Sequence, residues 1–202
     1  MPHLKINNFR FIGTLLLATL VTACAVMQEP APPTVVESTT PEQRVAAIRA
    51  AAGVDDKELA VQPLRDPQVE DLRETAARAL AARDYAAAAE ALNQAILIVP
   101  EDPAVLQERA EVALLLRDFD RAETLAQRAF DLGSQVGPLC RQHWETIRQI
   151  RERRLEIASA PVARQSAEEA ARQATSIAAL KTAVIQAAEQ RDACTVPGIN
   201  RM

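Results

Sequence analysis

Histidine is almost absent from this chain of 202 residues, which contains two, His3 and His143. Neither has cysteines or a carboxylate cluster near it at the spacing that metal ligands need. The serines likewise lack a histidine in any nucleophile motif, and the five glycines form no phosphate-binding loop. We therefore expect no enzyme activity, no cofactor, no metal and no small-molecule substrate.

Basic residues are not in excess either. The chain has 23 lysines and arginines against 27 aspartates and glutamates, a net charge of −4 at pH 7. Nucleic-acid binding relies on a basic surface that neutralises phosphates, so nucleic acid is not an expected partner. The length is sufficient for one modest folded domain with tails.

The N-terminal segment combines a basic start, a short apolar stretch and a cysteine. Lys5 and Arg10 precede apolar residues at 11–21, a stretch too short to span a bilayer as a permanent helix. Val21-Thr22-Ala23-Cys24 follows directly. This arrangement resembles the signal peptide of bacterial lipoproteins. The alternatives are a buried cysteine near an ordinary cleavage site, or a short membrane helix.

The resemblance implies that a dedicated peptidase removes residues 1–23 and that Cys24 becomes the lipidated first residue. Several acyl chains would anchor the protein stably, since each buried methylene contributes about 0.8 kcal/mol. Ala25 stands where an aspartate would favour retention in the inner membrane. The expected location is therefore the outer membrane, with the domain facing the periplasm.

A Pro-rich tether is expected over residues 24–40, because AVMQEPAPPTVVESTT (25–40) has no helical periodicity. A short helix is predicted to begin at Thr40-Pro41, where Gln43 completes a capping box, and to end at Gly53. The rest of the segment 41–68 is polar and contains prolines, which indicates mostly loop.

Residues 69–135 contain an internal repeat with a period of 34 residues. Asp84 falls on Asp118, and Tyr85 falls on Phe119. Alanine lets two helix axes approach closely, because no large side chain stands between them. The pattern predicts an all-α fold with two antiparallel helical hairpins. Three alanines of each copy keep the same register: Ala76, Ala88, Ala95, Ala110, Ala122 and Ala129.

This spacing of small residues resembles the tetratricopeptide repeat (TPR). In that family the first helices of successive hairpins line a concave surface. The resemblance implies that this surface accepts an extended peptide or a partner helix. The candidate partner-binding residues at the matching positions are Glu70, Arg73, Leu80, Gln107, Glu111 and Leu114.

Two repeats need a cap to cover their exposed end, and a capping helix is predicted within 136–158. Trp144 is expected in the core, His143 half-exposed beside it, and the arginines of 148–154 on a solvated helix face. Residues 159–202 are Ala-rich and predict a further helix and a tail. This helix either folds back on the repeats or partly frays. We place its apolar seam on Ala163, Ala167, Ala170, Ala174 and Ile177.

Cys140 and Cys194 remain once Cys24 is lipidated, in an oxidising compartment. They either form a disulfide that pins the C-terminal helix to the capping helix, or stay separate. In the second case Cys140 is a small core residue and Cys194 lies in a frayed tail.

These features together indicate an outer-membrane-anchored periplasmic lipoprotein with TPR-like repeats. We expect it to act as a protein–protein interaction adaptor, or as a factor for envelope, secretion or pilus assembly. Its expected partners are a protein and, through the lipid anchor, the membrane. The alternative is a passive envelope spacer that self-associates through the C-terminal helix.

Overall fold

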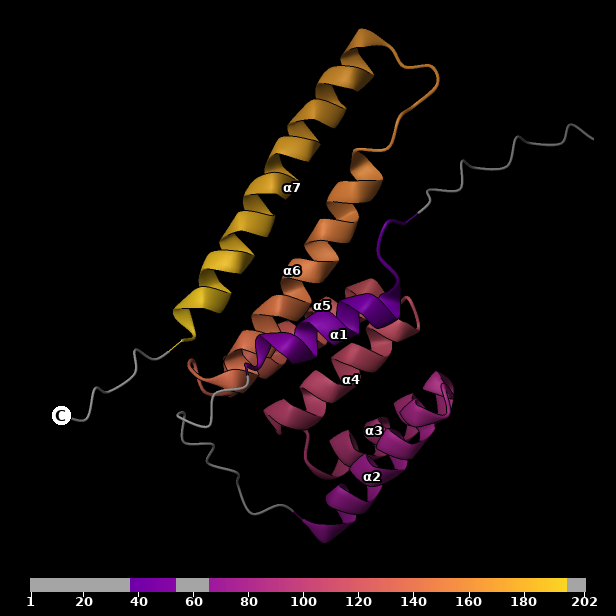
Figure 1. Ribbon diagram of the computed structural model, residues 1–202, viewed down its shortest axis with the longest axis vertical. Coiled ribbons are helices and arrows are strands. Elements are labelled where there is room, and N and C mark those ends of the chain that lie inside the picture. Colours follow the sequence, from indigo (N-terminus) through magenta and orange to yellow (C-terminus); the bar gives the residue numbers. More distant parts are fainter. Residues whose placement is uncertain (1–36, 54–65, 196–202) are drawn as a thin grey trace, which may run out of the picture. The chain divides into compact units, whose positions relative to one another are not determined.

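The computed structural model describes residues 37–53 and 66–195, and this part of the chain is all-α (Figure 1). It contains seven helices and no strand. Their bounds are α1 Pro41–Ala51, α2 Pro67–Ala81, α3 Tyr85–Ile98, α4 Pro103–Leu115, α5 Phe119–Leu132, α6 Pro138–Ala158 and α7 Ala167–Ala193. The expected signal segment 1–23, Cys24, Ala25 and the tether up to residue 36 lie outside the described residues, as do 54–65 and 196–202.

Prolines and side-chain caps set where the helices begin. A proline stands in the first turn of α1, α2, α4 and α6, where its missing N–H leaves no helical bond unmade. The predicted capping box of α1 is confirmed. The Gln43 backbone N–H donates to Thr40 Oγ1 at 3.2 Å, and the Thr40 N–H donates to Gln43 Oε1 at 2.9 Å. Gly53 follows α1 with φ of +84°, the conformation that ends a helix.

The two predicted hairpins are α2–α3 and α4–α5, and their turns have the same geometry. Arg83 and Arg117 precede the second helix of each hairpin and adopt left-handed φ values of 59° and 62°. Asp84 and Asp118 then cap α3 and α5. The N–H of each aspartate donates, at 2.9 Å, to the carbonyl five residues before it. The 34-residue period of the sequence is therefore a period of the backbone as well.

Small residues fill the interior of both hairpins. All six alanines of the repeat are at most 2% exposed: Ala76, Ala88, Ala95, Ala110, Ala122 and Ala129. Those of α2 and α3 pack with Leu92, Val105 and Val112, so the first hairpin shares its core with α4. The expectation that alanines line the contacts between helices is confirmed.

The capping helix α6 packs on α5, and α7 returns along α6 as its antiparallel partner (Figure 1). A disulfide joins Cys140 in the first turn of α6 to Cys194, which caps the end of α7, with 5.7 Å between their Cα atoms. The Gly137 N–H also donates to the Cys194 carbonyl at 2.8 Å. Of the two arrangements open for these cysteines, the structure contains the bridge.

Trp144 stands on the face of α6 that meets α5. Its ring lies edge-on to that of Phe130, with 5.0 Å between the ring centroids. It also packs against the cluster of Ala110, Ala126, Ile147 and Ala187. The side chain contributes to the core, as expected.

The predicted seam of α7 is correct only at Ile177, which is partly buried. Its alanines Ala167, Ala170 and Ala174 are exposed, as is Ala163 before the helix. The covered side of α7 continues from Ile177 through Leu180, Val184 and Ala187, three or four residues apart. Larger aliphatic side chains remove more apolar area from water than alanine does, so they determine which face of an Ala-rich helix is buried.

Overpacking an alanine site tests the hairpin packing. Ala88→Leu should lower the melting temperature by about 2–10 °C, because extra methylenes in a fully buried site cost about 1–3 kcal/mol. Ala87→Leu is the matched control, since Ala87 is exposed on the same helix. Thermal unfolding followed by circular dichroism measures both. Equal melting temperatures for the two variants would contradict the packing described above.

The disulfide gives a second prediction. Mass spectrometry of non-reduced peptides from exported protein should find Cys140 linked to Cys194. Cys194→Ser should reduce the free energy of unfolding by up to about 4 kcal/mol, because the bridge closes a long loop. Alkylation of both thiols in the folded, exported protein would show that the bridge is absent.

Candidate functional site on helices α4 and α6

Helix α1 lies across α4 and α6 and runs antiparallel to both (Figure 1). Near the C-terminal end of α1, Arg49 meets Glu111 of α4 and the Ala51 carbonyl accepts from Arg141 in the first turn of α6. Near the N-terminal end, Arg44 reaches the second half of α6. We call the surface that α1 covers the α4–α6 face. It consists of Glu111, Leu114, Gln149, Ile150 and Glu156.

The apolar part of this contact is small. Val45 and Ile48 of α1 share one buried cluster with Leu114 of α4 and Ile150 of α6. These two aliphatic residues are 5% exposed or less. Because α1 has only 11 residues, its helix depends on this packing and on its caps rather than on intrinsic propensity.

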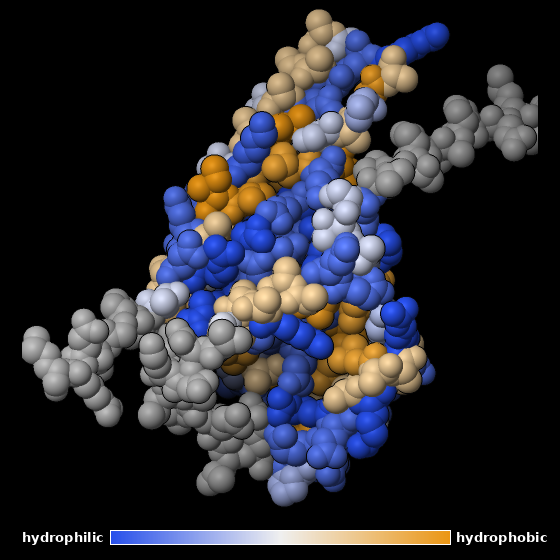
Figure 2. Space-filling view, viewed as in Figure 1, coloured by the Kyte–Doolittle hydropathy of each residue, from blue (hydrophilic) through white to orange (hydrophobic). Residues whose placement is uncertain are grey.

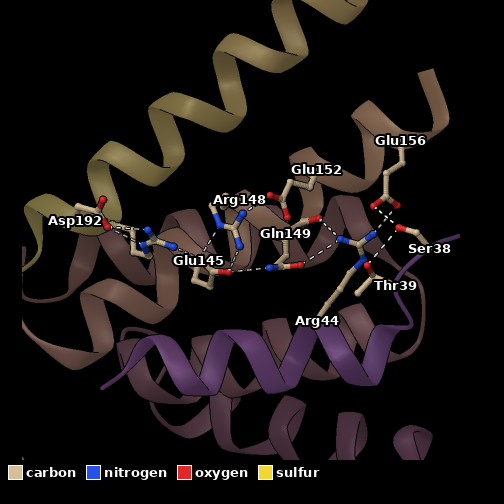
Figure 3. Close-up of polar contacts among 10 residues, drawn as sticks. Ser38, Thr39, Arg44, Glu145, Arg148, Gln149, Glu152, Glu156 and Asp192 are labelled. Atoms are coloured by element: carbon tan, nitrogen blue, oxygen red, sulfur yellow. Dashed lines mark hydrogen bonds and ion pairs between the residues drawn. The ribbon is translucent and has the colours of Figure 1, made fainter. Parts of the chain in front are cut away.

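Arg44 is the most buried charged group of the contact, with a side chain 2% exposed. Its Nη1 donates to the Gln149 carbonyl at 3.0 Å and to Gln149 Oε1 at 3.2 Å. Its Nη2 donates to Glu156 Oε2 at 2.8 Å (Figure 3). Both terminal nitrogens are thus engaged by α6, which fixes where α1 lies along that helix.

Arg49 and Glu111 form the second ion pair between α1 and the face. Arg49 Nε donates to Glu111 Oε2 at 2.8 Å, and Gln107 Nε2 donates to the other carboxylate oxygen at 3.2 Å. Burial raises the pKa of Glu111, and Arg49 opposes that shift in part. The face therefore holds a buried carboxylate that needs a cation from the helix above it.

His143 lies beside this carboxylate and is fully buried, which corrects the expectation that it is half-exposed. Its Nδ1 lies 2.8 Å from Gln107 Oε1, while Gln107 Nε2 donates to Thr146 Oγ1 at 2.9 Å. Burial lowers the pKa of His143 to about 4, so the ring is neutral at pH 7. When Nδ1 carries the proton, His143 donates to Gln107 Oε1, and Gln107 of α4 is then bonded to two residues of α6.

A chain of polar contacts runs along α6 from α7 to α1, as Figure 3 shows. Arg191 of α7 donates to Glu145 at 2.9 Å, Gln149 donates to Glu145 at 2.8 Å, and Arg44 continues the chain from Gln149 to Glu156. Burial of Glu145 would raise its pKa, but the bonds from Arg148, Gln149 and Arg191 outweigh burial and lower it. Glu145 is therefore held as a carboxylate.

The arginines of 148–154 are not a free solvated face. Arg148 pairs with Glu145 and Glu152, and the other three pair with acids of other segments. Arg151 contacts Glu123, Arg153 contacts Glu37, and Arg154 contacts Glu123 and Asp120. Arg153 also lies over the ring of Phe119, 3.7 Å from its centroid. These pairs attach α6 to α5 and to the segment before α1.

The predicted partner-binding residues divide into two groups. Gln107, Glu111 and Leu114 are buried, so the expectation that they line an open surface is corrected: α1 covers Glu111 and Leu114, and Gln107 bonds to Glu111 beneath. Glu70, Arg73 and Leu80 on α2 remain partly exposed.

Arg73 binds both acids near it on the inner helices. It donates to Glu70 at 2.8 Å and to Glu108 of α4 at 3.0 Å. The bond to Glu108 is the main reason that its pKa is raised. This arginine is therefore already paired, and it links α2 to α4.

Sequence reasoning did not single out Arg44, Gln149 and Glu145, and it placed His143 half-exposed instead of buried. The one available signal was the pair Val45 and Ile48, two aliphatic residues on one side of a short polar helix. Such a pair needs cover, but the sequence does not indicate which helices provide it.

The buried histidine predicts how stability depends on pH. His143 has a pKa near 6.5 in the unfolded chain and about 4 in the folded chain. The folded state therefore keeps its full stability with respect to this residue above pH 6.5, and the free energy of unfolding decreases as the pH falls from 6.5 towards 4. The loss should reach up to about 3 kcal/mol. His143→Gln cannot titrate, so chemical denaturation should show a smaller loss over this range. Parallel curves for the two proteins would contradict the burial of a neutral ring.

No family model, curated protein or solved structure matches this chain. Among residues 37–53 and 66–195, histidine, cysteine and acidic residues nowhere gather in a group that could hold a metal ion. Within the same ranges, none of the helices is both long and apolar enough to cross a membrane. The features of this chain that bear on function are the α4–α6 face and the N-terminal sequence.

Proposed function

We propose that this protein is an outer-membrane lipoprotein whose helical-repeat domain acts as a periplasmic protein–protein interaction adaptor or assembly factor. The proposal has two parts, an anchor at Cys24 and an interaction surface on the inner helices of TPR-like hairpins. Neither part requires catalysis, a cofactor or a metal.

The anchor is supported by the order of segments before Cys24. A basic start, an apolar stretch at 11–21 and small residues at 22 and 23 are typical of lipoprotein signals. One acyl chain binds membranes only marginally, whereas two or more hold a protein stably. Glu37 and Ser38, near the C-terminal end of the proposed tether, bond to Arg153 and Glu156 of α6. The tether would therefore enter the domain at α6.

The observation that carries the adaptor part is that the inner helix α4 and the capping helix α6 together hold a helix. α1 places two aliphatic side chains and two arginines on them. A surface with this combination of apolar and charged groups fits a helix-in-groove mode of recognition. The repeated Arg-Asp turns and the buried alanines support the resemblance to TPR hairpins.

The passive spacer is the weaker alternative. It needs the apolar side of α7 to be available to other copies of the chain. Ile177, Leu180 and Val184 are instead partly covered in the hairpin with α6, whose ends the disulfide joins.

Substitution of Cys24 tests the proposal. Cys24→Ser should abolish incorporation of a fatty-acid analogue and leave the precursor unprocessed, whereas Cys140→Ser should leave labelling unchanged. In-cell crosslinking followed by mass spectrometry should link the acylated protein to defined envelope proteins, and these links should decline in the Cys24→Ser strain. Unchanged labelling of Cys24→Ser would contradict the anchor, and the absence of any heterologous crosslink would contradict the adaptor role.

A further inference from the structure

The two sides of the contact between α1 and the α4–α6 face carry opposite charges. α1 brings the cations, Arg44 and Arg49, and the face brings the carboxylates, Glu156 and Glu111. Between the two ion pairs, Val45 and Ile48 meet Leu114 and Ile150. The face therefore recognises a specific sequence pattern, in which two arginines five residues apart flank two aliphatic residues.

The apolar contact that keeps α1 on the face is small. α1 is the shortest of the described helices, and two aliphatic side chains carry most of its apolar contact. The Arg49 side chain is 55% exposed, so one of the two ion pairs is open to solvent. Isolated helices of this length are marginal in water, so α1 loses its helical order when it leaves the face.

The face, in contrast, does not tolerate being uncovered. Glu111 is buried beside Gln107 and His143, and its pKa is raised by that burial. Removal of α1 leaves this carboxylate without its cation and exposes Leu114 and Ile150 to water. A face with an unpaired carboxylate and uncovered aliphatic side chains favours replacement of α1 over its simple release.

We propose that α1 is a replaceable occupant of the α4–α6 face, and that the protein partner binds by inserting an arginine-bearing amphipathic helix in place of α1. This inference rests on the proposed adaptor function and specifies its ligand. The partner helix runs antiparallel to α4 and α6. It places cations opposite Glu111 and Glu156 and aliphatic side chains over Leu114.

The α1 sequence itself provides the probe. A fluorescent peptide of residues 37–53 stands in for the partner helix, and its binding to the full chain is measured by anisotropy. Wild-type chain should bind it weakly, because the tethered α1 competes at high effective concentration. Arg49→Glu in the chain places a second carboxylate next to Glu111, and the repulsion weakens the docking of the tethered α1. The wild-type peptide should therefore bind this variant about tenfold or more tightly than it binds the wild-type chain.

Three further measurements test whether the change in affinity is specific to α1. Arg78→Glu changes an exposed arginine on α2 and should leave binding as in wild type. A peptide with Arg44→Glu and Arg49→Glu should lose binding to every chain. Ile48→Ala, which weakens the apolar contact without adding charge, should increase affinity for the wild-type peptide as Arg49→Glu does. Circular dichroism confirms that each variant is folded.

Several outcomes would overturn the proposal. Equal affinity of the Arg49→Glu, Ile48→Ala and Arg78→Glu chains would show that α1 does not compete for the face. Equal binding of the charge-reversed peptide would remove the role of Glu111 and Glu156. A dimer in sedimentation experiments that exchanges α1 between copies would assign the face to a second chain. The peptide-binding measurement does not depend on acylation. A negative result would therefore not contradict the anchor at Cys24, and a negative labelling result at Cys24 would not contradict the peptide binding.

Discussion

Close approach of helices through alanine is the constraint on which the rest of the structure depends. With Ala88 and Ala122 fully buried, the two helices of each hairpin approach closely. Ala110 of α4 and Ala126 of α5 pack against Ile147 of α6 in the same way. Gln107 of α4 bonds to His143 and Thr146 of α6. Larger residues at these positions would separate the helices and widen the surface on which α1 lies.

Polar groups determine where α1 lies on that surface, since its few apolar contacts would allow it to slide. Arg44 engages Gln149 and Glu156, and Arg49 engages Glu111, so the two cations fix both the position of α1 and its direction. Buried ion pairs often contribute little net stability, because the charges lose their hydration. Their effect here is on specificity: a helix without cations at these two positions leaves the buried Glu111 and the partly exposed Glu156 without their ion-pair partners.

Features that depend on neighbouring residues could be predicted from the sequence. The capping box of Thr40 and Gln43, the turns at Arg83 and Arg117 and the buried alanines all follow from local spacing. The all-α fold follows from the same periodicity.

Features that depend on distant segments could not be predicted. Burial of His143 requires Gln107, which lies 36 residues earlier, and burial of Arg44 requires Gln149, which lies 105 residues later. The covered side of α7 was predicted correctly only at Ile177, because alanine occurs on several sides of the helix and the larger Leu180 and Val184 determine which side is buried. The candidate site shares only α4 with the predicted surface, and neither its second helix α6 nor its occupant α1 was predicted.

The distance in sequence between α1 and its contacts has a consequence for the order of folding. The hairpins α2–α3 and α4–α5 form through local contacts, which close short loops and assemble quickly. α1 instead waits for residues of α6 that lie more than 100 positions further along the chain, Gln149 and Glu156. A chain synthesised from its N-terminus thus presents α1 first but cannot dock it until α6 has been made. Throughout that interval α4 exposes Glu111 and Leu114, which α1 covers only once α6 is in place.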